Sequence, residues 1–310
     1  MRSVFVRRAT KITVACLTAV LISSCSGGEP EGGSVPFVIS GGPGPATVWA
    51  IGDAGHLGER ERPVARLIAD ANPDRLLYLG DVYETGTAED FEDYDALYGD
   101  LAQLTAPTIG NHEFPNRAEG YDPYWESKKG RTPPAYYTTD IAGWEILSLD
   151  SQIFGDDQGE QLSWLRRKVA GPGNCRLAFW HEPRYSAGET TGGGDEPGVD
   201  DLWQSVQGKA ALVINAHDHN MQRMKPVGGT VQFISGAGGH GFRYPLDEAD
   251  PRFDFLDEDH DGALRIRLSP GRATLDFVAV GGEVLDSSEV SCSRVQQGLG
   301  AQPASRDADG

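Results

Sequence analysis

Five short polar clusters contain residue types that can bind metal ions. Each follows an apolar run that we expect to be a β-strand; they read Gly52-Asp53-Ala54-Gly55, Gly80-Asp81-Val82-Tyr83, Gly110-Asn111-His112-Glu113, Trp180-His181-Glu182-Pro183 and Ala216-His217-Asp218-His219. Because ligands bind at the carboxyl ends of strands in open α/β sheets, these side chains can converge in one crevice. Carboxylate and imidazole groups together suit Mn, Fe or Zn rather than Ca. The pattern therefore predicts a transition-metal site.

The order and spacing of these clusters carry more information than any one of them. A lone Gly-Asp pair is usually a turn or a helix cap, and a lone His is more often a core or surface residue. A His-x-His sequence can also be a strand with both imidazoles on one face. However, the first three clusters are separated by about the length of a strand followed by a helix. Five such clusters in this order would arise by chance very rarely.

Together the clusters resemble the motifs of the calcineurin-like metallophosphoesterase superfamily, in its purple-acid-phosphatase-like branch. The resemblance covers roughly residues 47–280, which is nearly the whole domain. It implies an α/β fold, a four-layer α/β/β/α sandwich of two mixed sheets flanked by helices, with a site for two metal ions (Fe, Mn or Zn). It also implies an enzyme that hydrolyses phosphate esters, with phosphomonoesters favoured over phosphodiesters.

The resemblance assigns a role to each candidate residue by its position. Asp81 would bridge the two metal ions, and Asp53 and His219 would bind the first of them. The second metal would be bound by three residues of the later clusters, namely Asn111, His181 and His217. His112 would contact the phosphoryl group or protonate the leaving oxygen.

Three positions depart from the pattern of the family. Many members have a His two residues after the first Asp, where this chain has Gly55. Purple acid phosphatases also lack that His and use a Tyr three residues after the bridging Asp; here that position is Glu84, and Tyr83 comes one residue early. Tyr83 is the candidate ligand, and the alternative is that it packs on the loop and leaves Glu84 or water at the metal. Ala216 replaces the usual Gly, which is a small change.

Two metal ions about 3.5–4 Å apart can lower the pKa of a bridging water, so that a metal-bridging hydroxide attacks phosphorus. The protein then has little acid–base work beyond helping the leaving group depart. Two alternatives use the same fold: a non-catalytic surface module that binds phosphate or a partner, and a metal-dependent hydrolase of another bond. The phosphoesterase is favoured because only the Tyr/His position has lost a usual ligand type.

Three further residues have weaker signals. Arg184, three residues after His181, could clamp a phosphate group or form a surface salt bridge. His240 lies on a glycine-rich loop and could line the site, although an ordinary loop His is the simpler reading. His56 lies three residues after Asp53 and could replace the missing ligand.

The elements that must position these residues alternate in the first half of the chain. The expected strands are eight apolar runs, at residues 47–51, 76–79, 144–149, 176–180, 211–215, 231–234, 263–268 and 273–280. The expected helices are three amphipathic segments, at residues 59–71, 88–104 and 158–169. Strand–helix alternation indicates parallel pairing, and the strand-on-strand order of the last third indicates antiparallel pairing.

The N-terminus predicts export. Residues 1–24 combine four basic residues with an apolar stretch too short to span a bilayer, as in a signal peptide. The stretch ends in Leu-Ile-Ser-Ser followed by Cys25, which resembles a bacterial lipobox; an ordinary signal peptide with an incidental Cys is the alternative. We therefore expect a lipoprotein anchored to the bacterial cell surface or membrane. Residues 25–45 would be a flexible tether, residues 46–292 the metallophosphoesterase domain and residues 293–310 a disordered tail.

The net charge bears on which molecules the protein can bind, and the cysteines bear on its disulfide bonding. Removing the four positive charges of residues 1–24 from a net charge of −19 leaves −23. Such a chain should repel nucleic acid, so we expect a small phosphate ester as substrate and membrane contact through the lipid only. Cys175 and Cys292 remain after processing and are expected to form a disulfide in an oxidising compartment, the alternative being two free thiols. No feature indicates an oligomeric state.

Overall fold

The computed structural model describes residues 36–293, apart from residues 56, 189–193, 242 and 244. The described residues belong to one compact unit. The expected signal peptide, Cys25, His56 and residues 294–310 of the expected tail lie outside this part of the chain. Among the described residues, no helix has the length and apolar character needed to cross a membrane.

The first sheet has six strands and supplies the first three polar clusters. Its order is β13 (Val284–Ser291), β12 (Arg272–Ala279), β11 (Gly262–Ser269), β1 (Ala46–Ile51), β2 (Arg75–Tyr78) and β3 (Thr105–Pro107). Strands β1, β2 and β3 are parallel, because helices connect them, whereas β1 pairs antiparallel with β11. Strands β11, β12 and β13 are joined by tight turns and are antiparallel.

The second sheet has seven strands and supplies the two histidine clusters. Its order is β10 (Phe253–Asp257), β8 (Met221–Met224), β9 (Val231–Ser235), β7 (Leu212–Asn215), β6 (Arg176–Phe179), β5 (Trp144–Ser148) and β4 (Tyr137–Ile141). The four strands β5, β6, β7 and β9 are parallel. Both sheets are therefore mixed, as expected.

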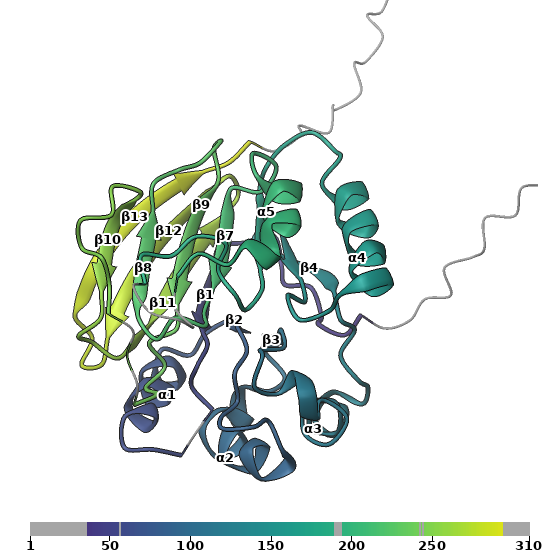
Figure 1. Ribbon diagram of the computed structural model, residues 1–310, viewed down its shortest axis with the longest axis vertical. Helices are drawn as coiled ribbons and strands as arrows, with labels where there is room; N and C mark the ends of the chain where they lie inside the picture. The colour runs from purple at the N-terminus through teal and green to yellow at the C-terminus, as the bar shows by residue number, and fades with distance from the viewer. Residues whose placement is uncertain (1–35, 56, 189–193, 242, 244, 294–310) are drawn as a thin grey trace, which may run out of the picture. The chain divides into compact units, whose positions relative to one another are not determined.

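Helices flank both sheets and complete the predicted α/β fold (Figure 1). The helices that follow β1, β2 and β3 are α1 (Glu61–Asp70), α2 (Ala88–Tyr98) and α3 (Tyr121–Lys129), whose buried residues join the apolar cluster of the six-stranded sheet. Helices α4 (Gly155–Lys168) and α5 (Asp200–Val206) pack on the other sheet. Short 3₁₀ turns lie at Gly99–Leu101, Phe114–Asn116 and Pro197–Val199.

The alternation of side chains along the central strands separates two apolar cores. Along β6, Leu177 and Phe179 join a core that also contains Leu264 and Ile266 of the opposite sheet. Ala178, between them, joins the core under α4 and α5. Successive side chains of a strand point to opposite faces, so an almost wholly apolar strand can serve both cores. This explains why β6 reads as an uninterrupted apolar run.

Part of the expected tether is packed on the domain. Phe37 and Val38 are buried, and Arg75 donates a hydrogen bond of 2.6 Å to the carbonyl of Ile39. The amide of Gly41 also donates to the carbonyl of Asp140, at 2.6 Å. The glycine and proline content of this segment suggested flexibility, but two apolar side chains anchor it. Phe37 and Val38 therefore belong to the packed part of the chain, while the expected domain boundaries stay a prediction.

A disulfide joins Cys175 and Cys292, whose Cα atoms lie 4.9 Å apart. Cys175 precedes β6 and Cys292 follows β13, so the bond links one sheet to the other. Beside it, the amide of Asn174 donates to the carbonyl of Ser293 at 3.0 Å. The last edge strand of the first sheet is thereby tied to the centre of the second.

Candidate metal centre

The polar clusters lie at the carboxyl ends of five parallel strands. Asp53, Asp81 and Asn111 follow β1, β2 and β3 of the first sheet, and His181 and His217 follow β6 and β7 of the second. The loops also contact one another directly: the Asp53 amide donates to the carbonyl of Gly80 at 3.1 Å. Both sheets therefore present their carboxyl ends to one crevice, as expected from the parallel strands.

Four side chains meet in a first group of donor atoms. One donor atom from each of Asp81, His181 and His217 lies within 4.8 Å of the other two. The amide oxygen of Asn111 is 2.9 Å from His181 Nε2 and 3.0 Å from His217 Nδ1. The two imidazole nitrogens are only 3.2 Å apart. These are the residues to which the sequence assigned the second metal.

A second group of donor atoms adjoins the first through Asp81. The Tyr83 hydroxyl is 2.7 Å from His219 Nε2, 3.1 Å from Asp81 Oδ2 and 3.2 Å from Asp53 Oδ1. His219 Nε2 is 3.8 Å from the same oxygen of Asp53. The hydroxyl of Tyr83 thus lies among the three residues expected to hold the first metal, despite the one-residue difference in spacing. Its role as a ligand remains a prediction.

The glycine at position 55 explains how Tyr83 reaches this place. A Cβ atom on Gly55 would lie 2.6 Å from the Cα of Val82 and 2.9 Å from its Cγ1. A His at this position would therefore displace the backbone of the loop after β2. Residues 83–85 form a turn immediately after this contact. The absence of the usual His and the inward position of Tyr83 are two consequences of the same close approach.

Backbone strain is concentrated in this crevice. Only five non-glycine residues among those described have a positive φ, and three of them are Asp53 (57°), Asp81 (63°) and His217 (71°). The left-handed conformation is uncommon outside glycine and has a cost of about 1–3 kcal/mol where the surroundings enforce it. Its concentration at three candidate ligands is typical of a functional site.

Buried charge supports a cation site. Asp53 and Asp81 are 0% and 1% exposed, and among the described residues neither carboxylate is paired with a Lys or Arg. Buried carboxylates without such partners require protons or metal ions. Burial raises the pKa of Asp53 well above its usual value. Against the effect of burial, the nearby His181 holds the pKa of Asp81 below its usual value.

The histidines respond to the same charges. Burial would lower the pKa of His181, but the negative charge of Asp81 raises it to about 10. Burial and then the charge of His181 lower the pKa of His217 to about 3. Two imidazoles 3.2 Å apart thus hold one positive charge between them. Metal ions bind neutral imidazoles and ionised carboxylates, so the residues present fit two cations that would replace this proton.

His112 is held by one ring nitrogen and presents the other to the site. Its Nδ1 lies 2.6 Å from the carbonyl oxygen of Glu84; a carbonyl only accepts, so Nδ1 donates. Its Nε2 lies 3.9 Å from Asp81 Oδ2. The side chain is 34% exposed, so a bound substrate can reach it.

Glu113 is a site residue that sequence reasoning did not assign. It is completely buried, and its carboxylate accepts hydrogen bonds from the amides of Gly110 (2.9 Å), Asp81 (3.1 Å) and Val82 (3.1 Å). A Cβ atom on Gly110 would lie 2.1 Å from Asp81 Oδ1, so only glycine permits this approach. Glu113 therefore ties the loops after β2 and β3 together. Its place in the Gly-Asn-His-Glu cluster was the available signal.

The weaker candidates have different outcomes. Arg184 donates to Asp200 Oδ1 at 2.7 Å, and its guanidinium lies 4.5 Å from the centre of the Tyr185 ring. Arg184 therefore forms the salt bridge that was the alternative to phosphate binding. To bind a phosphate group, Arg184 would have to release Asp200. His240 does line the site, with its ring 4.1 Å from that of Tyr83 and 4.6 Å from that of His219.

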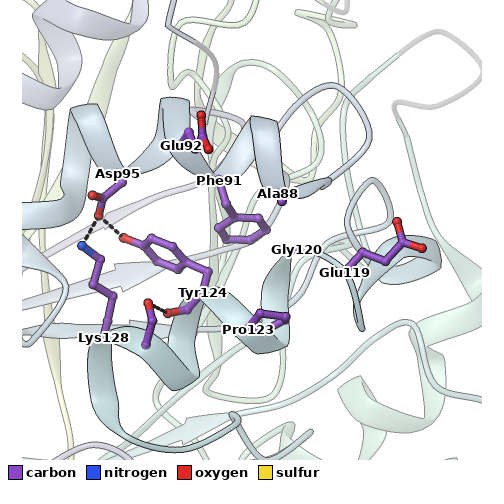
Figure 2. Close-up of a pocket in the computed structure, with 10 residues that line it drawn as sticks. Ala88, Phe91, Glu92, Asp95, Glu119, Gly120, Pro123, Tyr124 and Lys128 are labelled. Atoms are coloured by element: carbon purple, nitrogen blue, oxygen red, sulfur yellow. Dashed lines mark hydrogen bonds and ion pairs between the residues drawn. The ribbon is translucent and has the colours of Figure 1, made fainter.

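A pocket of about 400 Å³ lies elsewhere, between α2 and α3 (Figure 2). Phe91 and Tyr124 form its apolar wall, and Tyr124 and Lys128 both contact Asp95. None of the residues that line it is a candidate ligand. We place the chemistry at the metal centre because the donor atoms and the unpaired carboxylates are there.

Comparison with protein families and curated proteins agrees with this geometry. A family model described as calcineurin-like phosphoesterase matches residues 46–221. The chain is 32% identical over 130 residues to a probable cyclic nucleotide phosphodiesterase of Synechococcus sp., which covers 38% of this chain and 46% of that protein. It is 29% identical over 127 residues to another from Rhodococcus erythropolis, covering 36% and 40%. The chain thus matches less than half the length of these curated relatives.

Solved structures share the fold at low identity. A purple acid phosphatase from yellow lupin (Lupinus luteus) seeds superposes with a TM-score of 0.66 at 18% identity, covering 83% of this chain and 55% of that one. GAP50, the anchor in the inner membrane complex of Plasmodium, gives a TM-score of 0.62 at 14% identity, covering 81% and 90%. A dimetal phosphatase from Danio rerio gives 0.54 at 11% identity, covering 83% and 99%.

Proposed function

The chain belongs to the calcineurin-like phosphoesterase family, and from this premise we propose that it hydrolyses phosphate esters with two bound metal ions. The observation that carries the proposal is the pair of adjoining donor groups that share Asp81. Asn111, His181 and His217 lie on one side of this carboxylate. Asp53, Tyr83 and His219 lie on the other, which supports the purple-acid-phosphatase-like branch.

The residues of the chain divide the work of the reaction. When bound, two metal ions would activate water for attack and neutralise the charge that develops on the phosphoryl group. Asp81, buried beside both donor groups, would fix the separation of the two sites. His112, held through Nδ1 by the Glu84 carbonyl, would direct Nε2 toward the phosphoryl group or the leaving oxygen. The Glu113 carboxylate would keep the loops that carry Asp81 and Asn111 in register.

Phosphomonoesters are the proposed substrates, and phosphodiesters are the second candidate. The likeness of the Tyr83 site to that of purple acid phosphatases favours monoesters. The names of the two curated relatives favour diesters, and Arg184, whose charge could help bind a dianionic monoester, is paired with Asp200. In either class we propose a small ester rather than nucleic acid, because the chain has a net charge of −19.

Hydrolysis of p-nitrophenyl phosphate and of its bis ester, with Mn²⁺, Zn²⁺ or iron supplied, tests the function and separates the two substrate classes. The chain loaded with metal should hydrolyse at least one of them, and chelation should abolish the activity. If neither ester is hydrolysed at full metal content, the alternative of a non-catalytic binding module is favoured instead.

Three variants test the division of roles, with metal content measured alongside turnover. Asp81→Ala and His217→Ala should lose both bound metal and turnover. His112→Ala should keep the metal and lose roughly 10²–10⁴-fold in turnover, as expected for a general acid. His260→Ala is the matched control, because His260 is 46% exposed and its side chain pairs with Asp257 rather than with a candidate ligand. Equal metal loss in all three site variants would contradict the separate role of His112.

A further inference from the structure

Tyr83 lies between two imidazole rings. The His240 ring packs against it at a centroid distance of 4.1 Å and an interplanar angle of 34°, and the His112 ring meets it edge-on at 4.4 Å and 74°. As a result Tyr83 is only 2% exposed. We infer that His240 is a positioning residue that holds the Tyr83 ring so that its hydroxyl lies in the first metal site. This inference deepens the proposed function and rests on it for its catalytic meaning.

The loop that carries His240 is shaped to make this contact. It follows β9, and a Cβ atom on Gly238 would lie 2.3 Å from the Cβ of Ala54 and 2.4 Å from the carbonyl oxygen of Gly52. Gly239 has a φ of +112°, and a Cβ atom there would lie 2.6 Å from the amide nitrogen of Glu61. Any other residue would push the loop away from the loop of Asp53 at position 238, and away from the start of α1 at position 239. The two glycines therefore bring His240 over Tyr83.

Glu84 joins both histidines to the same turn. Its carbonyl oxygen accepts the 2.6 Å hydrogen bond from His112 Nδ1, and its Oε1 lies 3.4 Å from His240 Nε2. Tyr83 is thus held through its ring, and the next residue through its backbone and its side chain. The turn after Val82 cannot rotate Tyr83 out of the crevice without breaking contacts to both histidines.

The buried edge of the His240 ring, which carries Nδ1, is held by ring packing rather than by hydrogen bonding. Its Nδ1 is buried and has no hydrogen-bond partner in the described part of the chain. The ring also meets that of His219 at 4.6 Å. Two of the rings that surround His240 therefore belong to candidate ligands of the first metal. Loss of the His240 ring would open one face of Tyr83 to solvent and allow the hydroxyl to leave its place.

The first test needs no metal. The metal-free protein is labelled with ¹³C on the tyrosine rings, and the Tyr83 signal is identified by its absence in Tyr83→Phe. His240→Ala should shift this signal, because a ring 4.1 Å away no longer contributes its ring current. His240→Phe should keep a ring-current shift, and His260→Ala should leave the spectrum unchanged. A Tyr83 signal in His240→Ala identical to that of the wild type would overturn the inference.

The second test measures the first metal site. His240→Ala should weaken Fe³⁺ binding by roughly 10–100-fold, as is typical when a group that orients a ligand is lost, and should shift the tyrosinate absorption band. His240→Phe should restore most of the affinity, because packing is kept while the contact to Glu84 is lost. Unchanged affinity and absorption in His240→Ala would refute the positioning role.

The two tests also separate this inference from the proposed function. If the wild type binds iron without colour, Tyr83 is not a ligand, while the metal-free spectra still show whether the His240 ring packs on the Tyr83 ring. If the wild type is coloured but hydrolyses no ester, the catalytic proposal fails and the positioning role is judged by iron affinity alone.

Discussion

At the residue scale, the protonation of Tyr83 distinguishes the metal-free protein from the loaded one. Burial and the charges of Asp53 and Asp81 raise the pKa of Tyr83 well above its usual value. Without a cation the hydroxyl therefore stays protonated and can donate to a neighbouring carboxylate. Only a strongly charged metal ion would stabilise the phenolate here, because a cation favours the ionised form of a nearby acid.

This leads to a prediction about colour. Protein loaded with Fe³⁺ should absorb visible light through phenolate-to-metal charge transfer, and metal-free protein should be colourless. Tyr83→Phe should lose the band while its thermal midpoint stays close to that of the wild type, because the buried ring is kept. Absorption spectra at matched iron content check this. A colourless wild type with full iron would assign the first site to divalent ions and water.

Glu113 gives a second prediction at this scale. Glu113→Gln replaces one of the carboxylate oxygens that accept from Gly110, Asp81 and Val82 with an amide NH₂ group. An N–H facing another N–H is repulsive, so the loop that carries Asp81 should shift. We expect a loss of roughly 10–100-fold in Mn²⁺ affinity, measured by titration calorimetry, although no ligand is changed. Glu119→Gln, an exposed neighbour, should bind as the wild type does; equal affinities in both variants would contradict the role of Glu113.

The sequence could predict which side chains meet, but less about what holds them. Asp53, Asp81 and Asn111 could be grouped because each ends a parallel strand, and the structure brings them together. Glu113 and His240 act through backbone amides and ring packing, which depend on the distance between loops from different strands. Such distances have no local pattern in the chain. The close approach at Gly55 likewise becomes visible only when Val82 is seen beside it.

At the scale of elements, helices and strands with a strong apolar periodicity could be predicted from the sequence, whereas those with few apolar residues could not. The expected helix at residues 88–104 ends at Tyr98, because a 3₁₀ turn at Gly99–Leu101 and a further turn at residues 102–104 lead into β3. Strand β13 was missed because, on the sheet edge, it alternates exposed and half-buried residues without an apolar run. Helix α3 was missed because it presents only Tyr121, Tyr124 and Trp125 to the core.

Lys129, the last residue of α3, allows a prediction about stability and pH. Its ammonium lies 5.4 Å from the Phe37 ring and 5.8 Å from the Trp125 ring. It therefore packs against Phe37, which lies in the segment expected to be a flexible tether. Burial, and then the charge of Arg75, lower the pKa of Lys129 to about 8 from 10.5. Between these values the unfolded chain binds more protons than the folded one, so stability should rise with pH in this window.

The comparison with Lys129→Met isolates this effect. Raising the pH from 7.5 to 9.5 should stabilise the wild type by about 1 kcal/mol relative to the variant, after allowance for partial solvent exposure. Urea unfolding at the two pH values gives the difference. Lys168→Met, on the exposed end of α4, should follow the wild type at both values. A pH response of Lys129→Met equal to that of the wild type would show that Lys129 is not desolvated.

At the scale of the whole molecule, charge bears on where the protein can reside. A chain with a net charge of −19 is repelled overall by anionic headgroups, so we expect surface electrostatics to contribute little to membrane attachment. The proposed attachment therefore depends on lipid at Cys25 alone.

This dependence makes the localisation testable. Wild-type protein expressed in a bacterium that processes lipoproteins should stay in the membrane fraction through a wash in 1 M NaCl, because a lipid anchor is insensitive to salt, whereas a charge-based attachment would be released. Cys25→Ser should appear in the soluble fraction or remain as unprocessed precursor. Cys16→Ser is the matched control, since Cys16 lies within the segment that would be removed and should not change the fractionation. Mass spectrometry of the mature N-terminus completes the test: a wild-type protein recovered wholly soluble, and beginning at a residue other than Cys25, would rule out the anchor and leave an exported, unattached enzyme as the alternative.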